Sequence, residues 1–329
     1  MILAGDVGGT KTVLALGDER GRVGREEVFQ CEEYPSLEAI LDEFLRGREA
    51  AGLSGACFGV AGPVVGTTAK ITNLPWTIDA RSLAGKLGGA PVTLLNDLQA
   101  TALGTLVLPP EAFAVLQPGT ADTKEAPIAV IAPGTGLGEA TLVWDGERYI
   151  ALPSEGGHAD FAPTTDEEIE LLRFLRGRYG GHVSYERVLS GDGVGDLYDF
   201  VRIASGTREP TWLAAQIATG DKNAIVSKAA LDKSDDACVR ALEMFAQILG
   251  AEAGNLALRT MATGGVVIGG GIPPKNLPAL QSGALMERFT AKGRFSGWAR
   301  TLAVRVTLEP RAALLGASHF VATSKSAKP

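Results

Sequence analysis

The sequence predicts an α/β protein made of two related lobes, and three observations carry this prediction. The chain has 329 residues, 45% of them hydrophobic, which is enough for about two domains that each bury a core. Apolar, strand-like runs alternate with helical patterns, as in folds with crossover connections. One supersecondary unit also occurs twice, roughly 125 residues apart, which indicates a weak internal repeat.

The repeated unit consists of an apolar strand, a Gly/Thr-rich loop, a second apolar strand and a turn of the Asp-Gly type. In the first copy the loop is Gly5-Asp6-Val7-Gly8-Gly9-Thr10, and strand-like residues 12–16 follow it. In the second copy residues 128–132 lead into Gly134-Thr135-Gly136-Leu137-Gly138, and residues 140–144 follow. Each copy therefore predicts a β-hairpin around a glycine loop.

The remaining elements follow from hydrophobic periodicity and from proline and glycine breaks. In the first lobe we expect helices at 36–48, 79–87 and 98–106, and strands at 55–61 and 91–95. Prolines 109 and 110 and the stretch 118–124 predict a linker. In the second lobe we expect helices at 165–179, 195–204, 211–219 and 235–261, strands at 266–269 and 302–308, a last helix at 311–322 and a frayed tail at 323–329.

Composition argues against several classes of protein. A net charge of −7 without a long basic run makes nucleic acid an improbable partner. The cysteines are Cys31, Cys57 and Cys238, whose odd number and wide spacing argue against a disulfide framework or a zinc ribbon and fit a reducing cytosol. No apolar run approaches the ~20 residues of a membrane span, and the apolar start is too short for a signal peptide. We therefore expect a cytoplasmic protein with no membrane partner.

Glycine is unusually frequent, with 42 residues or about twice the usual ~7% share. The glycines gather directly after apolar runs, at 5–9, 134–138, 156–157 and 264–271. Backbone amides in such turns suit phosphate groups. A P-loop is a poor match, because Thr10 precedes Lys11-Thr12 where that motif needs glycine, and a strand follows instead of a helix. The dinucleotide fingerprint fails on its glycine spacing.

Five short segments contain candidate functional groups. Asp6 could form an Asx-turn or face a metal ion or phosphate. Asn96-Asp97 ends a strand, where it could cap the next helix or supply a general base. Glu155-Gly156-Gly157-His158 lacks nearby metal ligands and suits the capture of a polyol by hydrogen bonds. Glu186 by itself would be an exposed salt-bridging acid. The triple glycine 269–271 allows close approach of a flat ring or a phosphate.

Taken in order, these segments resemble bacterial glucokinases, a family in the sugar kinase, Hsp70 and actin superfamily. The resemblance is collinear over nearly the whole chain. It implies two ribonuclease-H-like (actin-like ATPase) lobes with an interdomain cleft: a small α/β domain at 1–110, completed by the C-terminal helix 311–323, and a large α/β domain at 111–310. It also implies a homodimer that makes glucose 6-phosphate from ATP and D-glucose.

The resemblance assigns roles residue by residue. Asp97 would be the base that deprotonates the sugar 6-hydroxyl, and Asn96, Glu155, His158 and Glu186 would bind the sugar together with it. Asp6 would orient Mg²⁺, directly or through water. ATP would be bound by residues of the three glycine groups, namely Gly5, Asp6, Val7, Gly8, Gly9, Thr10, Lys11, Gly134, Thr135, Gly136, Gly270 and Gly271.

Three residues depart from the family pattern. Lys11 stands where many of these glucokinases have Asn, and this departure brings the chain closer to the related ROK sugar kinases. Pro133 and Glu139 flank the second loop, where the family usually has small or apolar residues. The chain lacks the cysteine-rich zinc motif of ROK proteins, so we expect no zinc. The alternatives are a kinase for another hexose or amino sugar, a sugar-responsive regulatory protein, and an ATPase or phosphohydrolase without a sugar. ADP or polyphosphate are alternative phosphoryl donors.

Overall fold

The computed structural model describes residues 1–47, 52–120 and 124–324. Helices and strands alternate along it, which confirms the predicted α/β class. The described residues form two compact units. The first unit comprises those within 1–112, 140–153 and 309–329, and the second those within 113–139 and 154–308.

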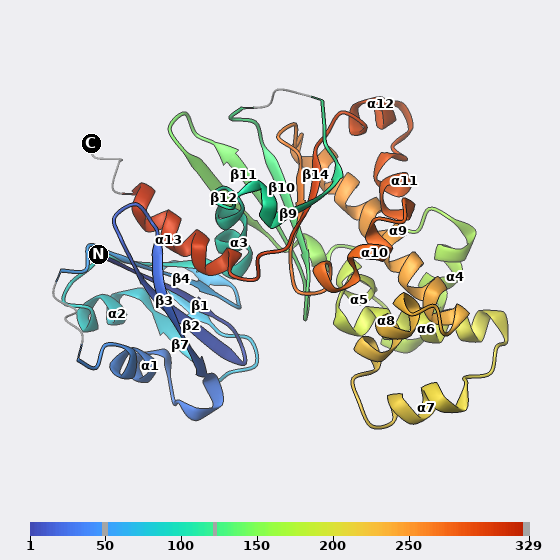
Figure 1. Ribbon diagram of the computed structural model, residues 1–329, viewed down its shortest axis with the longest axis horizontal. Coiled ribbons are helices and arrows are strands. Elements are labelled where there is room, and N and C mark those ends of the chain that lie inside the picture. Colours follow the sequence, from blue (N-terminus) through green and yellow to red (C-terminus); the bar gives the residue numbers. More distant parts are fainter. Residues whose placement is uncertain (48–51, 121–123, 325–329) are drawn as a thin grey trace. The chain divides into compact units, whose positions relative to one another are not determined.

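The first unit is built on a five-stranded sheet (Figure 1). Its strand order is β3 (Val23–Gln30), β2 (Lys11–Gly17), β1 (Ile2–Val7), β4 (Ala56–Val60) and β8 (Val92–Asn96). β1 is antiparallel to β2 and parallel to β4, which is in turn parallel to β8. The carboxyl ends of β1, β4 and β8 therefore lie at one edge. A small sheet of β5 (Val64–Val65), β6 (Thr68–Lys70) and β7 (Thr77–Asp79) accompanies it.

Side chains cap the N-termini of the first three α-helices of this unit. These helices are α1 (Leu37–Phe44), α2 (Ala80–Lys86), α3 (Asp97–Thr105) and α13 (Ala312–Ser324), with short 3₁₀ turns η1 (Cys31–Glu33) and η2 (Pro110–Ala112). Ser36 caps α1 and Asp79 caps α2 by accepting backbone N–H groups. α1 buries its apolar face, including Ile40 and Phe44, in the core of the unit. α13 packs along α3 and against β1 (Figure 1).

A second, six-stranded sheet follows. Its order is β12 (Tyr149–Ser154), β11 (Leu137–Trp144), β10 (Ile128–Pro133), β13 (Val266–Ile268), β14 (Val304–Thr307) and β9 (Phe113–Gln117). β10, β13 and β14 are parallel, and β9 is antiparallel to β14. The order β12-β11-β10-β13-β14 repeats the order β3-β2-β1-β4-β8, which confirms the predicted internal repeat.

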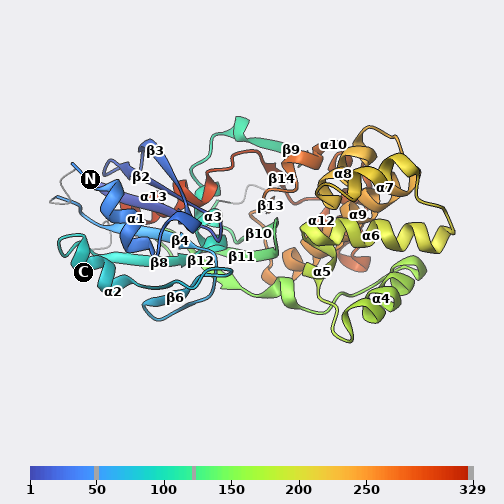
Figure 2. The same cartoon turned by 90° about the horizontal axis from the view of Figure 1, so that it is seen from below.

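Helices dominate residues 154–308 of the second unit (Figure 2). They are α4 (Asp166–Tyr179), α5 (Tyr185–Leu189), α6 (Gly191–Ser205), α7 (Thr211–Ile217), α8 (Lys222–Leu231), α9 (Asp236–Thr260), α10 (Leu277–Leu280), α11 (Ala284–Thr290) and α12 (Ser296–Ala299), with 3₁₀ turns η3 (Gly156–His158), η4 (Pro274–Asn276) and η5 (Gly293–Phe295). The long helix α9 packs against α6, α8 and α11, and its Phe245 and Leu249 are fully buried.

Several short elements were not predicted, namely β9, α5, α8 and α10–α12. Each is too short, or too evenly mixed in polarity, for a clear periodicity. Residue 48 of the predicted helix 36–48, residues 121–123 of the linker and residues 325–329 of the tail lie outside the described residues. α1 ends at Phe44, earlier than predicted, and α13 continues to Ser324, into the predicted tail. Among described residues, none of the helices has the length and apolar character to cross a bilayer. The three cysteines are buried and form no disulfide.

Candidate active site

The first glycine loop is a tight hairpin turn between β1 and β2. Val7 pairs with Thr12, and the Gly8 amide donates to the Lys11 carbonyl at 3.0 Å. A Cβ at Gly9 would lie 2.9 Å from the Thr72 carbonyl oxygen, so this close approach requires glycine. Since a strand follows the turn, a P-loop is excluded. The turn leaves Thr10 and Lys11 exposed and Gly5 and Val7 buried in β1.

Asp6 lies half-buried near the carboxyl end of β1. Burial, followed by the charge of Asp97, raises the pKa of Asp6 to about 6, while Lys11 acts in the opposite direction. The two aspartates thus influence each other, because parallel strands deliver both to one edge of the sheet. Within the described residues no cluster of three or more His, Cys, Asp or Glu residues could hold a metal ion. A single carboxylate fits Mg²⁺ that is held mainly by nucleotide phosphates.

Asn96 ends β8 and caps α3. Its Oδ1 accepts the Leu98 amide at 2.9 Å, and its own amide donates to Gln99 Oε1 at 3.1 Å. Its Nδ2 donates to the Gly62 carbonyl at 3.2 Å. The capping interpretation of Asn96 is therefore confirmed. Asp97, the first residue of α3, is half-buried and accepts the Leu98 amide at Oδ1.

The second glycine loop joins β10 to β11 and contacts Glu186. The Gly134 amide donates to the Gly136 carbonyl at 2.8 Å, which closes the turn around Thr135. The Leu137 amide donates to Glu186 Oε2 at 3.0 Å. Glu186 therefore does not behave as an isolated exposed acid, because its carboxylate is a hydrogen-bond acceptor for this loop.

Glu155, His158 and Glu186 are brought together in the second unit. Glu155 precedes the 3₁₀ turn η3, which ends at His158, and their side chains are 73% and 62% exposed. His158 Nε2 lies 3.8 Å from Glu155 Oε2, and its Nδ1 lies 3.8 Å from Glu186 Oε1. Three polar side chains that stay accessible and close together can offer several hydrogen bonds to a polyol.

The third glycine group follows β13 and packs on the end of β10. Gly270 has a φ of +83°, and a Cβ there would lie 2.2 Å from the Pro133 carbonyl oxygen. The Gly269 amide donates to Ile131, and the Ile272 amide to Pro133. A Cβ at Gly271 would meet nothing within 4 Å. The fold therefore requires glycine at 270, whereas the Gly271 backbone is open to a ligand.

Glu139, which departs from the family pattern, points into the protein. Its side chain is 1% exposed, and no hydrogen-bond partner for Oε1 is found in the described part of the chain. Burial raises the pKa of Glu139, against the opposing charge of Arg259. A Cβ at Gly156 would lie 2.0 Å from Glu139 Oε2. Gly156 is thus needed to make room for this carboxyl group.

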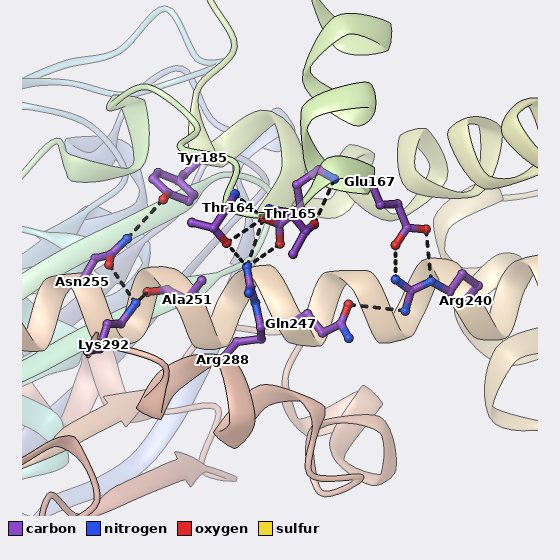
Figure 3. Close-up of polar contacts among 11 residues, drawn as sticks. Thr164, Thr165, Glu167, Tyr185, Arg240, Gln247, Ala251, Asn255, Arg288 and Lys292 are labelled. Carbon is purple, nitrogen blue, oxygen red and sulfur yellow. Dashed lines mark hydrogen bonds and ion pairs between the residues drawn. The ribbon is translucent and has the colours of Figure 1, made fainter. Parts of the chain in front are cut away.

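A chain of hydrogen bonds that ends at Tyr185, the neighbour of Glu186 in sequence, was not predicted (Figure 3). Lys292 Nζ donates to Asn255 Oδ1 at 2.8 Å, and Asn255 Nδ2 donates to the Tyr185 hydroxyl at 3.2 Å. Burial and the neighbouring charges of Arg288 and Arg259 lower the pKa of Lys292 to about 8. The signal in the sequence was a pair of polar residues, Glu252 and Asn255, within the otherwise apolar stretch 248–258 of α9.

Comparison with known proteins agrees with these features. A family model described as Glucokinase matches residues 3–324. A glucokinase of Trichormus variabilis is 39% identical over 335 residues, covering 97% of this chain and 98% of the relative.

Two solved structures show the fold. A glucokinase from an Antarctic psychrotroph matches with a TM-score of 0.85 and 31% identity, over 97% of this chain and 98% of the other. A ROK family glucokinase from Streptomyces griseus, solved with glucose and AMPPNP, matches with a TM-score of 0.64 and 20% identity over 97% and 98%. The predicted actin-like α/β fold is confirmed, and the chain belongs to the glucokinase family.

Proposed function

We propose that this chain transfers the γ-phosphoryl group of ATP to the 6-hydroxyl of D-glucose, giving glucose 6-phosphate and ADP. Membership of the glucokinase family supports this proposal. The observation that supports the chemistry is the pair Asp6 and Asp97 at the carboxyl edge of one sheet, where the charge of Asp97 helps to raise the pKa of Asp6. Active groups in open α/β sheets gather at such an edge.

Asp97 acts as the general base in this proposal. It takes the proton of the 6-hydroxyl while that oxygen attacks the γ-phosphorus, and the bond from this phosphorus to the oxygen of the ADP leaving group breaks. Phosphoryl transfer depends on positioning and on neutralising charge more than on covalent catalysis. A half-buried carboxylate at the start of a helix is held in place for this task.

The remaining sugar contacts are assigned to Asn96, Glu155, His158 and Glu186. The proximity of the last three in the second unit supports a shared role. The nucleotide is assigned to the three glycine groups, whose members are Gly5, Asp6, Val7, Gly8, Gly9, Thr10, Lys11, Gly134, Thr135, Gly136, Gly270 and Gly271. Asp6 would orient Mg²⁺, directly or through water, and the bound ion would neutralise phosphate charge.

We also propose a domain division, an oligomeric state and a location for this protein. We assign a small domain to 1–110 with the helix at 311–323 and a large domain to 111–310, and we expect a cytoplasmic homodimer. A mass measurement in solution that finds only monomer would contradict the dimer.

A coupled assay tests the proposed reaction directly. Glucose, mannose, galactose, fructose and glucosamine are each offered with ATP, with and without Mg²⁺. We expect the highest kcat/KM for glucose and no transfer after chelation of Mg²⁺. A higher kcat/KM for another sugar would identify a different hexose kinase. ATP hydrolysis at a rate that does not depend on any added sugar would identify an ATPase.

A further inference from the structure

The Glu186 carboxylate contacts two segments with different proposed ligands. Its Oε2 accepts the Leu137 amide of the second glycine loop at 3.0 Å. Its Oε1 lies 3.8 Å from His158 Nδ1 in the proposed sugar segment. The side chain is 30% exposed. One carboxylate is therefore shared between the loop assigned to phosphate and the residues assigned to sugar.

The loop is shaped around this carboxylate. A Cβ at Gly136 would lie 2.5 Å from Glu186 Oε2, so any other residue would displace the carboxylate or the loop. The Leu137 hydrogen bond is charge-assisted, which makes it one of the stronger kinds. The position of Glu186 and the conformation of residues 134–137 therefore depend on each other.

A second hydrogen bond connects the region around Glu186 to the second glycine loop. The Gly191 amide, at the start of α6, donates to the Gly134 carbonyl at 2.8 Å. Residues 186 and 191 flank the junction of α5 and α6, and they bind opposite ends of the loop. This junction thus holds the loop at both Gly134 and Leu137.

α5 is itself held in place by contacts of Tyr185 and Arg187. The Tyr185 amide donates to the Ala159 carbonyl at 3.0 Å, and the Tyr185 hydroxyl accepts from Asn255, which Lys292 holds in turn (Figure 3). The Arg187 guanidinium lies 4.2 Å from the centre of the Tyr179 ring. Glu186, between Tyr185 and Arg187, therefore extends from a helix with little freedom to move.

We propose that Glu186 is a positioning residue for the second phosphate loop, in addition to binding sugar. Its Oε2 holds the Leu137 amide so that the loop keeps the shape that receives the nucleotide phosphates. This inference rests on the proposed function of the loop. Its consequence is that nucleotide affinity depends on Glu186 even when no sugar is present, which a purely sugar-binding residue would not produce.

The test measures the Kd of AMPPNP by calorimetry without sugar. In Glu186→Ala we expect a Kd about tenfold higher, the loss expected for one hydrogen bond to a charged group. In Glu186→Gln we expect a change of less than about threefold, because the glutamine carbonyl oxygen can accept the same hydrogen bond. Glu147→Ala, on an exposed turn with no proposed ligand, is the control, and its AMPPNP Kd should equal that of the wild type.

A second pair of variants tests the other connection without changing Glu186. Gly191→Pro removes the N–H that bonds Gly134 and puts the proline ring in its place, against the Gly134 carbonyl oxygen that lies 2.8 Å from the Gly191 nitrogen. Ser190 already has the extended conformation (φ −106°, ψ −178°) that precedes proline. Gly191→Ala keeps the N–H, and its Cβ would lie 3.6 Å from the Gly134 carbonyl oxygen. We expect weaker AMPPNP binding for the proline variant only.

The possible outcomes separate this inference from the proposed function. Glu186→Ala with the wild-type AMPPNP Kd would overturn the inference, and so would Glu186→Gln binding as weakly as Glu186→Ala. If Glu186→Ala does not fold, the two Gly191 variants provide the test. Equal AMPPNP Kd values for Gly191→Pro and Gly191→Ala would also overturn the inference. A wild-type protein that binds AMPPNP but does not phosphorylate glucose would contradict the proposed reaction alone.

Discussion

At the scale of single residues, one local structure combines a helix cap with the proposed general base. Asn96 uses its side chain to cap α3 and to bond Gly62, and this arrangement fixes the start of the helix. Asp97 follows directly and is held near Asp6 at the edge of the sheet. The capping and the catalytic interpretations of Asn96-Asp97 therefore do not compete, because different side chains carry them.

Replacing Asp97 by Asn tests the base. Asparagine keeps the size of the side chain but cannot take a proton, so we expect kcat to fall by about 10²- to 10⁴-fold while glucose still binds. Steady-state kinetics combined with glucose-dependent thermal shifts would measure both quantities. A kcat near that of the wild type would exclude Asp97 as the base.

Glu139 allows a prediction on pH. Burial raises its pKa, so the folded state favours the protonated carboxyl group, and the wild type loses stability as pH rises above the ordinary value of 4.5. Glu139→Gln cannot ionise. We expect its Tm to exceed that of the wild type at pH 7 to 8 by about 2 °C, or ~1 kcal/mol, and the difference to vanish near pH 4.

Scanning calorimetry across this pH range measures the effect of Glu139→Gln. Glu147→Gln, on an exposed turn, is the control and should show no such trend. A difference in Tm that does not change with pH would rule out ionisation of Glu139 as its cause.

At the scale of elements, some of the glycine surplus serves helix packing. Ideal Cβ atoms at Gly104 of α3 and Gly316 of α13 would lie 1.9 Å from the Ala312 carbonyl oxygen and 1.8 Å from the Ala100 carbonyl oxygen. The two helices therefore approach at backbone distance. The sequence alone places the glycine surplus in loops, because glycines within helices produce no turn signal of their own.

This close approach predicts the effect of a single methyl group. Gly104→Ala forces α3 and α13 apart and should lower the free energy of unfolding by about 1–3 kcal/mol, the usual range for overpacking. Gly85→Ala in α2 is the matched control, because its Cβ would meet nothing within 4 Å, and it should stabilise by about 0.5–1 kcal/mol. Denaturant unfolding compares the two variants. A stable Gly104→Ala variant would show that the helices can separate without cost.

At the scale of the whole molecule, one strand order is used twice around two separate cores. Proposed ligand residues occur in both compact units. A small ligand that binds only the folded protein stabilises it by mass action. The response of the whole chain to sugar is therefore a measure of specificity that does not depend on turnover.

We expect glucose to raise the Tm, with stabilisation of about 2.7 kcal/mol at a concentration one hundred times its Kd. Galactose at the same concentration is the comparison, and thermal shift assays measure both. A larger Tm shift with galactose than with glucose, or a shift that only glucosamine produces, would contradict glucose as the preferred ligand.

Local patterns were sufficient for most of the fold. The alternation of strands and helices, the cap at Asn96 and the repeated hairpin all depend on residues close in sequence, so their signals survive without tertiary contacts. β9 and the short helices after β13 could not be predicted, because partners distant in sequence stabilise them.

The sequence by itself determined the fold class, the order of the glycine loops and the residue types available for phosphoryl transfer, because turn chemistry and periodicity are local properties. The tertiary structure decided which of these residues meet. Parallel β1, β4 and β8 bring Asp6 and Asp97 to one edge, and the junction of α5 and α6 places Glu186 on the Leu137 amide. It also turned Glu139 inward against Gly156, a consequence of packing between segments that no local pattern records.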